Sequence, residues 1–206
     1  MAILVLSLLL AALVPPSAVA QEQALKLGVV DMAKVLDGYK EFKQADSDYK
    51  KLLKERQDQL QDRMAVRLLS EEELKEYQNV QAVVAPSEEQ KKRMEQLRAV
   101  AQTREDELTG LQRVASPTDE QKKRLTELQT LGDKSSQEIS ALQQRLSDEI
   151  NQRNKELSEK LNKKIETALE AVAKEKRMDY ILAKDAVLYG GRDLTDEVLA
   201  KLNAAG

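Results

Sequence analysis

The residue types in this sequence that could do chemistry are carboxylates, lysines and arginines, because the chain has no His, no Cys and no Trp. Without imidazole and thiol groups, the usual zinc, haem and iron–sulfur sites have no ligands, and the usual nucleophilic catalysts have no base. The Glu and Asp residues lie on polar, helix-like stretches without the partner groups that acid–base catalysis requires. We therefore expect a protein that is not an enzyme and that binds no metal and no cofactor.

Two basic triplets are the next candidates for a binding role, and they belong to an internal duplication. The segment from Pro86 to Met94 matches the segment from Pro117 to Leu125 with an offset of 31 residues. Its Lys-Lys-Arg triplets, at 91–93 and 122–124, could contact a polypeptide or an anionic lipid. Such runs are more often solvated helix faces that pair with nearby Glu. The Gly190-Gly191 pair lacks the rest of any phosphate-binding motif, and we interpret it as a turn that ends a strand.

Composition and charge set the fold class. The chain has 206 residues, with 33 basic and 36 acidic side chains and a formal net charge of -3, which argues against a dedicated nucleic-acid binder. Aromatic residues make up only 3% and cannot organise a large globular core. The high content of Glu, Lys, Gln, Leu and Ala predicts long helices. The expected fold is mostly α with a small β element.

Residues 1–20 have a different composition from the rest of the chain. An uncharged apolar run is followed by Pro15 and Pro16 and then by Ala18-Val19-Ala20. A short apolar run before a small-x-small triplet is typical of a secretory signal peptide. The run is also shorter than the roughly 20 residues that span a bilayer. We expect residues 1–20 to be a signal peptide, with a buried N-terminal helix as the alternative.

The strand signals lie at the two ends of the chain. They are at 26–32, at 180–183 and at 186–189, where Lys184-Asp185 suits the tight turn of a hairpin. Asp31 and Thr195 are the expected N-caps of the helices that follow. Three short strands cannot form a stable domain alone, so we expect residues 21–40 and 178–206 to form a β-rich oligomerisation body. The apolar strand residues expected at its interface are Leu27, Val29, Val30, Ile181, Leu182, Val187 and Leu188.

Residues 41–177 predict an arm of two antiparallel helices. Apolar residues recur there at helical spacing, and several lie eleven residues apart, which predicts a nearly straight helix pair. About 60 residues in each leg would give an arm on the order of 90 Å. The expected seam between the legs is formed by Phe42, Tyr49, Leu53, Leu60, Ile139, Leu146, Ile150, Leu157 and Leu161.

The middle of the arm contains helix start and stop signals. Capping-box patterns begin at Ser70, Ser87, Thr118 and Ser135, with a weaker one at Thr103. Because the breaks are nearly symmetric, we expect the arm to be a jointed coiled-coil hairpin that turns at 99–103. Residues 115–117 are the alternative turn. The expected joints are Leu69, Ser70, Pro86, Ser87, Pro117, Thr118, Gly132 and Asp133.

Both ends of the chain resemble the Skp/OmpH family of periplasmic chaperones. The resemblance lies in Lys26-Leu27-Gly28-Val29-Val30-Asp31-Met32 and in the block from Ile165 to Leu202. It implies a homotrimer in the periplasm, with helical tentacles around a cavity. Such proteins act as ATP-independent holdases that keep unfolded outer-membrane β-barrel proteins from aggregating.

This chain differs from the better-known members of that family. It is mildly acidic where they are strongly basic, and its arm is longer and jointed. A structural spacer of the cell envelope, without a client, is the alternative function, and the sequence leaves contact with membranes open. The partners that we expect are therefore other copies of this chain and unfolded outer-membrane proteins, and no nucleic acid.

Overall fold

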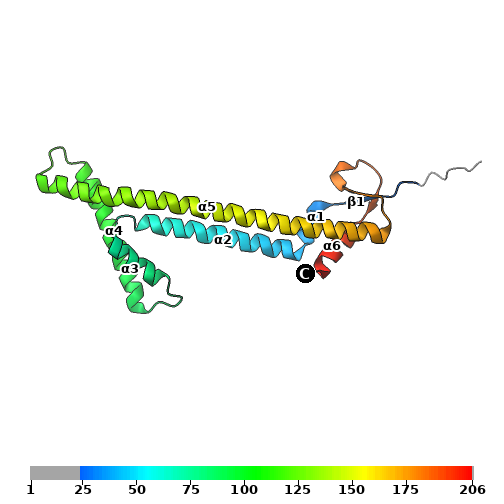
Figure 1. Ribbon diagram of the computed structural model, residues 1–206, viewed down its shortest axis with the longest axis horizontal. Helices are drawn as coiled ribbons and strands as arrows, with labels where there is room; N and C mark the ends of the chain where they lie inside the picture. Colours follow the sequence, from blue (N-terminus) through cyan, green and yellow to red (C-terminus); the bar gives the residue numbers. More distant parts are fainter. Residues whose placement is uncertain (1–23, 206) are drawn as a thin grey trace, which may run out of the picture.

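The computed structural model describes residues 24–205, and it joins a small body to a long helical arm that branches at its far end (Figure 1). The predicted fold class, mostly α with a small β element, is confirmed. The predicted signal peptide at 1–20 lies outside the described residues. Both ends of the described chain lie in the body, and everything between them forms the arm.

The body contains a parallel sheet of three strands. β1 (Leu27–Val30) lies in the middle, and β2 (Tyr180–Ala183) and β3 (Arg192–Asp193) lie on either side of it. Both neighbours run parallel to β1. The predicted hairpin is therefore wrong. The short 3-10 helix η1 (Lys184–Ala186) leads the chain across β1 instead of reversing it, and Val187 and Leu188 lie in this crossing loop, not in a strand.

Two glycines allow the crossing loop to pass close to β1. Gly190 and Gly191 have φ angles of 89° and 87°, in a region that L side chains rarely adopt. A Cβ atom on Gly191 would lie 2.7 Å from Cγ1 of Val29, so any other residue there would collide with the central strand. The glycine pair thus belongs to the crossover rather than to the end of a strand.

Helices cover one face of this sheet. They are α1 (Met32–Gly38), α6 (Thr195–Ala204) and the last turns of α5 (Asp119–Lys176). Their apolar core, called here the base cluster, consists of Val30, Val35, Tyr39, Leu161, Ile165, Ala168, Val172, Leu194, Val198 and Leu202. The base cluster thus joins residues 30–39 to residues 161–202, from the two ends of the described chain.

The two short helices of the body start in different ways. Asp31 accepts a hydrogen bond from the Lys34 N–H and caps α1, as predicted. The prediction for α6 is wrong, because Leu194 holds the N-cap position and Thr195 is the first helical residue. The Thr195 hydroxyl instead accepts a hydrogen bond from the Asp31 N–H at 3.0 Å. It therefore connects the starts of the first and last helices.

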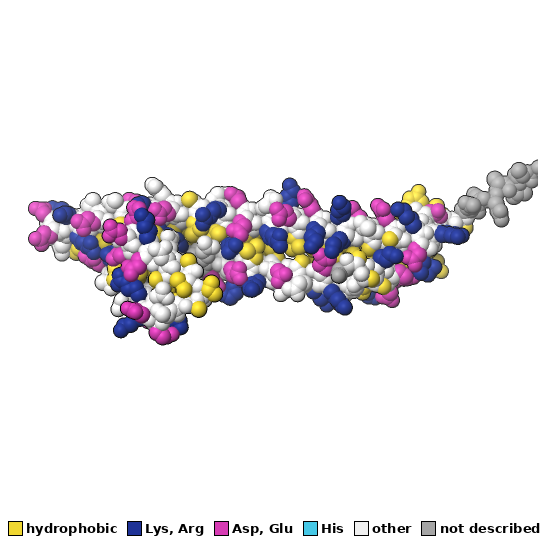
Figure 2. All heavy atoms as spheres, turned by 60° about the horizontal axis from the view of Figure 1, so that its bottom comes forward, with side chains coloured by type: hydrophobic (Ala, Val, Ile, Leu, Met, Phe, Trp, Pro, Cys, Tyr) yellow, Lys and Arg dark blue, Asp and Glu magenta, His cyan; other side chains and the backbone are white. Residues whose placement is uncertain are grey.

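The stalk of the arm is α2 (Lys40–Ala65) packed antiparallel on α5. Its apolar seam is thin. Of the expected seam residues, Leu146 and Leu161 are buried, Leu53 is 37% exposed, and the other six, Phe42, Tyr49, Leu60, Ile139, Ile150 and Leu157, are half-buried. Figure 2 shows this seam as a narrow band of apolar side chains between charged ones of both signs.

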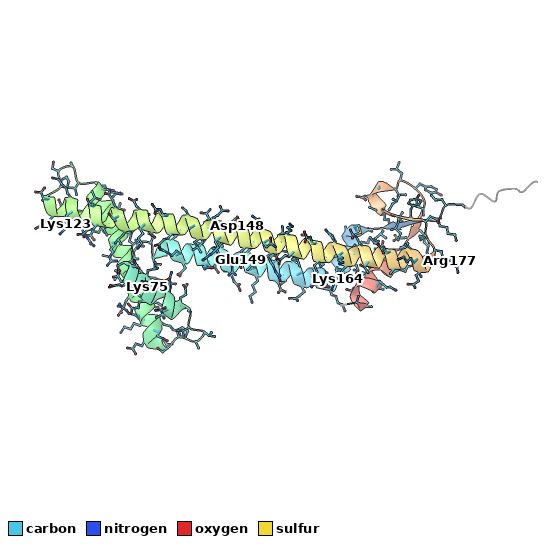
Figure 3. All side chains as sticks on the ribbon, viewed as in Figure 1. Lys75, Lys123, Asp148, Glu149, Lys164 and Arg177 are labelled. Atoms are coloured by element: carbon cyan, nitrogen blue, oxygen red, sulfur yellow. The ribbon has the colours of Figure 1, made fainter. Side chains whose placement is uncertain are left out.

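Ion pairs between the two stalk helices supplement this seam. Arg56 binds Glu149 through two nitrogens at 3.0 and 2.6 Å, and Arg63 binds Glu138 at 2.7 Å. Figure 3 shows Glu149 and Lys164 on the side of α5 that faces α2. α5 has 58 residues, which corresponds to about 90 Å of unbroken helix.

The chain does not turn at 99–103, where the symmetry of the helix breaks predicted the tip of the arm. α4 (Glu88–Gln112) runs unbroken through 99–103, so the predicted turn there is wrong. The chain reverses at 82–87, between α3 (Glu71–Gln81) and α4, and again at 113–118, between α4 and α5. The second reversal contains the alternative turn at 115–117, and it forms the outer end of the arm in Figure 1.

The predicted joint at Gly132-Asp133 is also wrong, because α5 continues through it. A Cβ atom on Gly132 would lie 3.6 Å from Cδ2 of Leu68, which is an ordinary van der Waals distance, so the glycine is a buried helical position rather than a helix end. Ser135, expected to start a helix, is buried inside α5. The capping boxes at Ser70, Ser87 and Thr118 are confirmed, and each begins a helix.

Candidate assembly and binding surfaces

The far end consists of two equivalent helical hairpins that follow from the sequence duplication. In the branch hairpin, α3 packs on the first half of α4, and in the tip hairpin, the second half of α4 packs on the start of α5. Arg93 binds both oxygens of Glu76 at 2.6 and 2.8 Å, and Arg124 binds both oxygens of Glu107 at 2.9 and 2.8 Å. Each residue of the second pair lies 31 positions after its counterpart. The duplication is therefore a duplicated structural unit, and α4 belongs to both copies.

A short link between α2 and α3 fills the cores of both hairpins. Tyr77 and Leu97 are buried in the branch hairpin, and Leu108 and Leu128, again 31 residues later, are buried in the tip hairpin. The link residues Val66 and Leu69 complete the first core, and Leu68 completes the second. The predicted joint at Leu69-Ser70 is thus a break between helices, but its apolar side chains lock both hairpins together.

Partly buried ion pairs surround this link. Arg104 donates to both oxygens of Glu73, at 2.5 and 2.9 Å, and to the carbonyl of Leu68 at 2.9 Å. Burial raises the pKa of Glu73, but the hydrogen bonds from Arg104 and Ser70 outweigh it and lower the pKa below its usual value. Arg67 binds Glu105 in the same region and its own pKa is raised by that hydrogen bond. These charge-assisted bonds hold α4 against the link.

Tyr77 has a hydrogen-bonded position in the core of the branch hairpin. Its hydroxyl donates to Asp62 at 2.7 Å and accepts from Arg98 at 2.8 Å, and the Arg98 guanidinium also lies 5.4 Å from the ring centroid. Burial and the bond to Asp62 raise the pKa of Tyr77 to about 12. The tyrosine therefore joins α2, α3 and α4 as a neutral group.

A second charged cluster lies where the stalk meets the body. Glu41 accepts hydrogen bonds from Lys164, from Lys160 at 2.9 Å and from the Tyr39 hydroxyl at 2.8 Å. The bonds from Lys164, Lys160 and Tyr39 lower the pKa of Glu41 to about 2. Burial and the same contact raise the pKa of Tyr39 to about 12. The start of α2 is thereby fixed on α5.

On the side of the sheet opposite the helices, the crossing loop covers part of β1, and apolar side chains of the strands and of this loop are exposed. Tyr180, Leu182, Leu188 and Tyr189 expose 58%, 42%, 105% and 97% of their surface, and together with Leu27 they are called here the open face. Strand register places Leu27 beside Tyr180 and Val29 beside Leu182 on this side of the sheet. An apolar group of this size on a small body is typical of an interaction surface.

The residues expected at the oligomer interface divide between the two faces. Val30 and Ile181 pack in the base cluster of their own chain, and Val29 is buried beneath the crossing loop. Leu182 and Leu188 are exposed on the open face, with Leu27 and Val187 half-buried. The sequence pattern did not separate these two groups, because it predicted a hairpin in which all of them would have been strand residues.

Most members of the basic triplets are engaged in ion pairs. Lys91 and Lys122 pair with the acidic first turns of their own helices, and Arg93 and Arg124 form the duplicated bonds described above. This arrangement matches the interpretation as solvated, paired helix faces. The bonds to Glu76 and Glu107 were missed in the sequence, although the 31-residue offset extends to both carboxylates.

Two further properties describe residues 24–205. None of their helices combines the length and the apolar character needed to cross a lipid bilayer. Within the same range, His, Cys, Asp and Glu side chains form no group of three or more that could hold a metal ion.

The fold and these surfaces define a class of proteins in which a small body with an open apolar face carries a long helical arm. The family model described as Outer membrane protein (OmpH-like) matches residues 71–202, which is more than half of the chain. The protein therefore belongs to the Skp/OmpH family, whose members are non-enzymatic periplasmic chaperones of outer-membrane proteins. No curated protein matches the chain.

Proposed function

We propose that this protein is an ATP-independent holdase of the periplasm that binds unfolded outer-membrane proteins as a homotrimer. The chain belongs to the Skp/OmpH family. The observation that supports the proposal is that its body exposes Leu188 and Tyr189 and carries an arm built on a helix of about 90 Å. The body would assemble copies of the chain, and the arms would enclose the client.

The open face supports self-association. Its exposed Tyr and Leu side chains lie on β2 and on the crossing loop of a sheet too small to be stable without its helices. Burial of such a patch is favourable by about 25 cal/mol per Å² of apolar surface. A closed ring buries this patch on every copy at once. Three copies joined through their bodies would project three arms from one base.

The arm supports holding rather than catalysis. Its surface carries charges of both signs with scattered apolar side chains (Figure 2), so an unfolded chain would meet many weak contacts instead of one pocket. Separation of unfolded chains keeps unpaired strand edges and apolar segments apart, which suppresses aggregation. Release would follow when a tighter receptor competes for the client.

Light scattering tests the holdase function. A urea-unfolded β-barrel protein is diluted into buffer with and without the protein lacking residues 1–20. We expect scattering to fall by at least tenfold at about one trimer per client. Unchanged scattering at a fivefold excess would contradict the proposal and favour an envelope spacer.

The native mass tests the assembly. We expect three copies in sedimentation, and we expect the double substitution Leu188→Asp with Tyr189→Asp to yield monomers. Val84→Asp is the matched control, because Val84 is just as exposed, at 102%, but lies in the reversal between α3 and α4. A wild-type chain that sediments as a folded monomer would contradict the trimer.

A further inference from the structure

A groove lies between the last turns of α5 and the end of α6, beside the start of α2 (Figure 1). Its volume is about 660 Å³, and small-molecule sites typically have about 300–1,000 Å³. It is called here the lysine groove. The helices that form it cover one side of the sheet, and association through the open face on the other side uses different residues.

Small side chains create the lysine groove. Ala171 on α5 is half-buried, Ala204 and Ala205 at the end of α6 are exposed, and all three line it. Their methyl groups leave a space between the two helices that longer side chains would fill. Tyr39 and Leu202 also line the groove but are buried, so its accessible apolar surface comes from the alanines and from the stems of lysines.

Four lysines surround this apolar surface, three on one face of α5 and one on α6, and they are Lys160, Lys163, Lys164 and Lys201. None of the residues that line the groove is acidic. Along much of the arm, in contrast, charges of both signs lie side by side (Figure 2). The groove is therefore a place where apolar surface and positive charge occur together.

Carboxylates outside the lining balance only part of this charge. Glu41 pairs with both Lys160 and Lys164, and Glu175 pairs with Lys201 at 3.2 Å. Lys163 is exposed and forms no ion pair within residues 24–205. Two carboxylates thus face four ammonium groups. A ligand can pair with Lys163 without breaking a contact that the chain already makes.

We propose that the lysine groove binds a fatty acid as a single molecule. The carboxylate of the ligand pairs with the ammonium group of Lys163, and its alkyl chain lies along Ala171, Ala204 and Ala205. A simple anion such as phosphate would leave the apolar surface uncovered, and the flat surface of a bilayer cannot enter a concave groove between two helices. The inference is independent of the proposed function, because neither a client nor a second copy of the chain takes part.

Calorimetric titration with sodium dodecanoate tests the ligand class. The protein lacking residues 1–20 is used, at dodecanoate concentrations where the ligand is monomeric. We expect one dodecanoate per chain, bound at least tenfold more tightly than dodecyltrimethylammonium, which has the same chain length and the opposite charge. Decanoate should bind at least threefold more weakly than dodecanoate, because each methylene removed from water adds to the affinity. Equal affinity for the two charges, or no saturation below about 1 mM, would overturn the proposal.

Two pairs of variants test the location. Lys163→Gln removes the unpaired charge, and its control is Lys155→Gln, because Lys155 is also an exposed lysine of α5 without an ion pair within residues 24–205 but does not line the groove. Ala204→Trp fills the groove from an exposed position, and its control is Ala200→Trp, at an exposed alanine of α6 outside the lining.

We expect the Kd for dodecanoate to rise at least fivefold in each groove variant and to stay unchanged in each control. An unchanged Kd in either groove variant, or an equal rise in a variant and its control, would overturn the proposal. Circular dichroism checks that all four variants keep the helix content of the wild type.

Vesicles distinguish a single bound molecule from a membrane surface. The wild type and Lys163→Gln are mixed with phosphatidylglycerol vesicles and separated by flotation. We expect Lys163→Gln to float to the same extent as the wild type while its binding of dodecanoate is weakened. If Lys163→Gln loses flotation and the wild type does not bind dodecanoate, the lysines belong to a membrane-binding surface and the proposal fails.

Discussion

The body and the far end of the arm are stabilised in opposite ways. The body depends on an apolar cluster between segments at the two ends of the sequence, such as Val30 and Leu194. The far end depends on contacts within short stretches, such as Arg93 with Glu76, and on caps that each span four residues. The far end should therefore be able to unfold while the body stays folded. The body, in contrast, cannot form until the chain has been synthesised through the arm to residues 161–202.

The largest expected effect is a cavity in the body. Leu194 is fully buried in the base cluster, so Leu194→Ala should lower the free energy of unfolding by about 3 kcal/mol. Hydrogen exchange should increase throughout the stalk and the body. The matched substitution Leu128→Ala removes an equally buried leucine from the tip hairpin, and its faster exchange should stay within the far end. Equal spread of exchange in both variants would contradict the difference between the two regions.

The next effect concerns the ion pairs of the far end. Arg104→Gln leaves the Glu73 carboxylate and the Leu68 carbonyl partly buried without their donor, which should cost about 1–2 kcal/mol. The increase in exchange should appear in α3 and α4. Lys92→Gln is the control, because this exposed basic residue lies inside α4 and forms no ion pair within residues 24–205. A loss of the same size in the control would show that helix propensity, not the ion pair, is responsible.

A smaller effect depends on pH at the foot of the stalk. The pKa of Glu41 is about 2, below its ordinary value of 4.5, so its stabilisation is complete above pH 4.5 and is lost as the pH falls toward 2. Because the carboxylate is partly exposed, Glu41→Gln should cost only about 1 kcal/mol at pH 7. Urea unfolding of wild type and variant should converge below pH 2, where the carboxylate is protonated in the folded state as well. A difference that persists at that pH would show that the charge is not the cause.

The smallest expected effect is a gain in stability at the end of α5. Arg177 has a φ of 53° at the C-cap, where the left-handed conformation favours glycine. Arg177→Gly should raise the free energy of unfolding by about 0.5 kcal/mol, and Arg177→Ala should not. Chemical denaturation of the three proteins measures this. Equal stability of the Gly and Ala variants would show that the backbone there is not strained.

The sequence predicts local features well and the arrangement in space poorly. The capping boxes at Ser70, Ser87 and Thr118 were predicted because each cap is complete within four residues. The crossing of β1 was missed because Lys184-Asp185 is compatible with either a hairpin turn or a 3-10 turn. The reason for a glycine at position 191 is its contact with Val29, and this contact is visible only in the folded structure.

The branch was missed for a similar reason. Helix breaks indicate where a chain can change direction, but they do not specify the angle. That angle is set by the alternate burial of Val66, Leu68 and Leu69 in two hairpins. Gly132 was interpreted as a helix end because glycine is common at C-caps, but α5 continues through it.

The duplicated unit lies entirely between the two chain ends that form the body, and this position has a consequence for evolution. Copying or deleting a 31-residue block in the middle of the gene changes the outer part of the molecule while every residue of the base stays in place. The reach of the arm and the number of its hairpins can thus vary among descendants one unit at a time, while the residues that form the body remain unchanged.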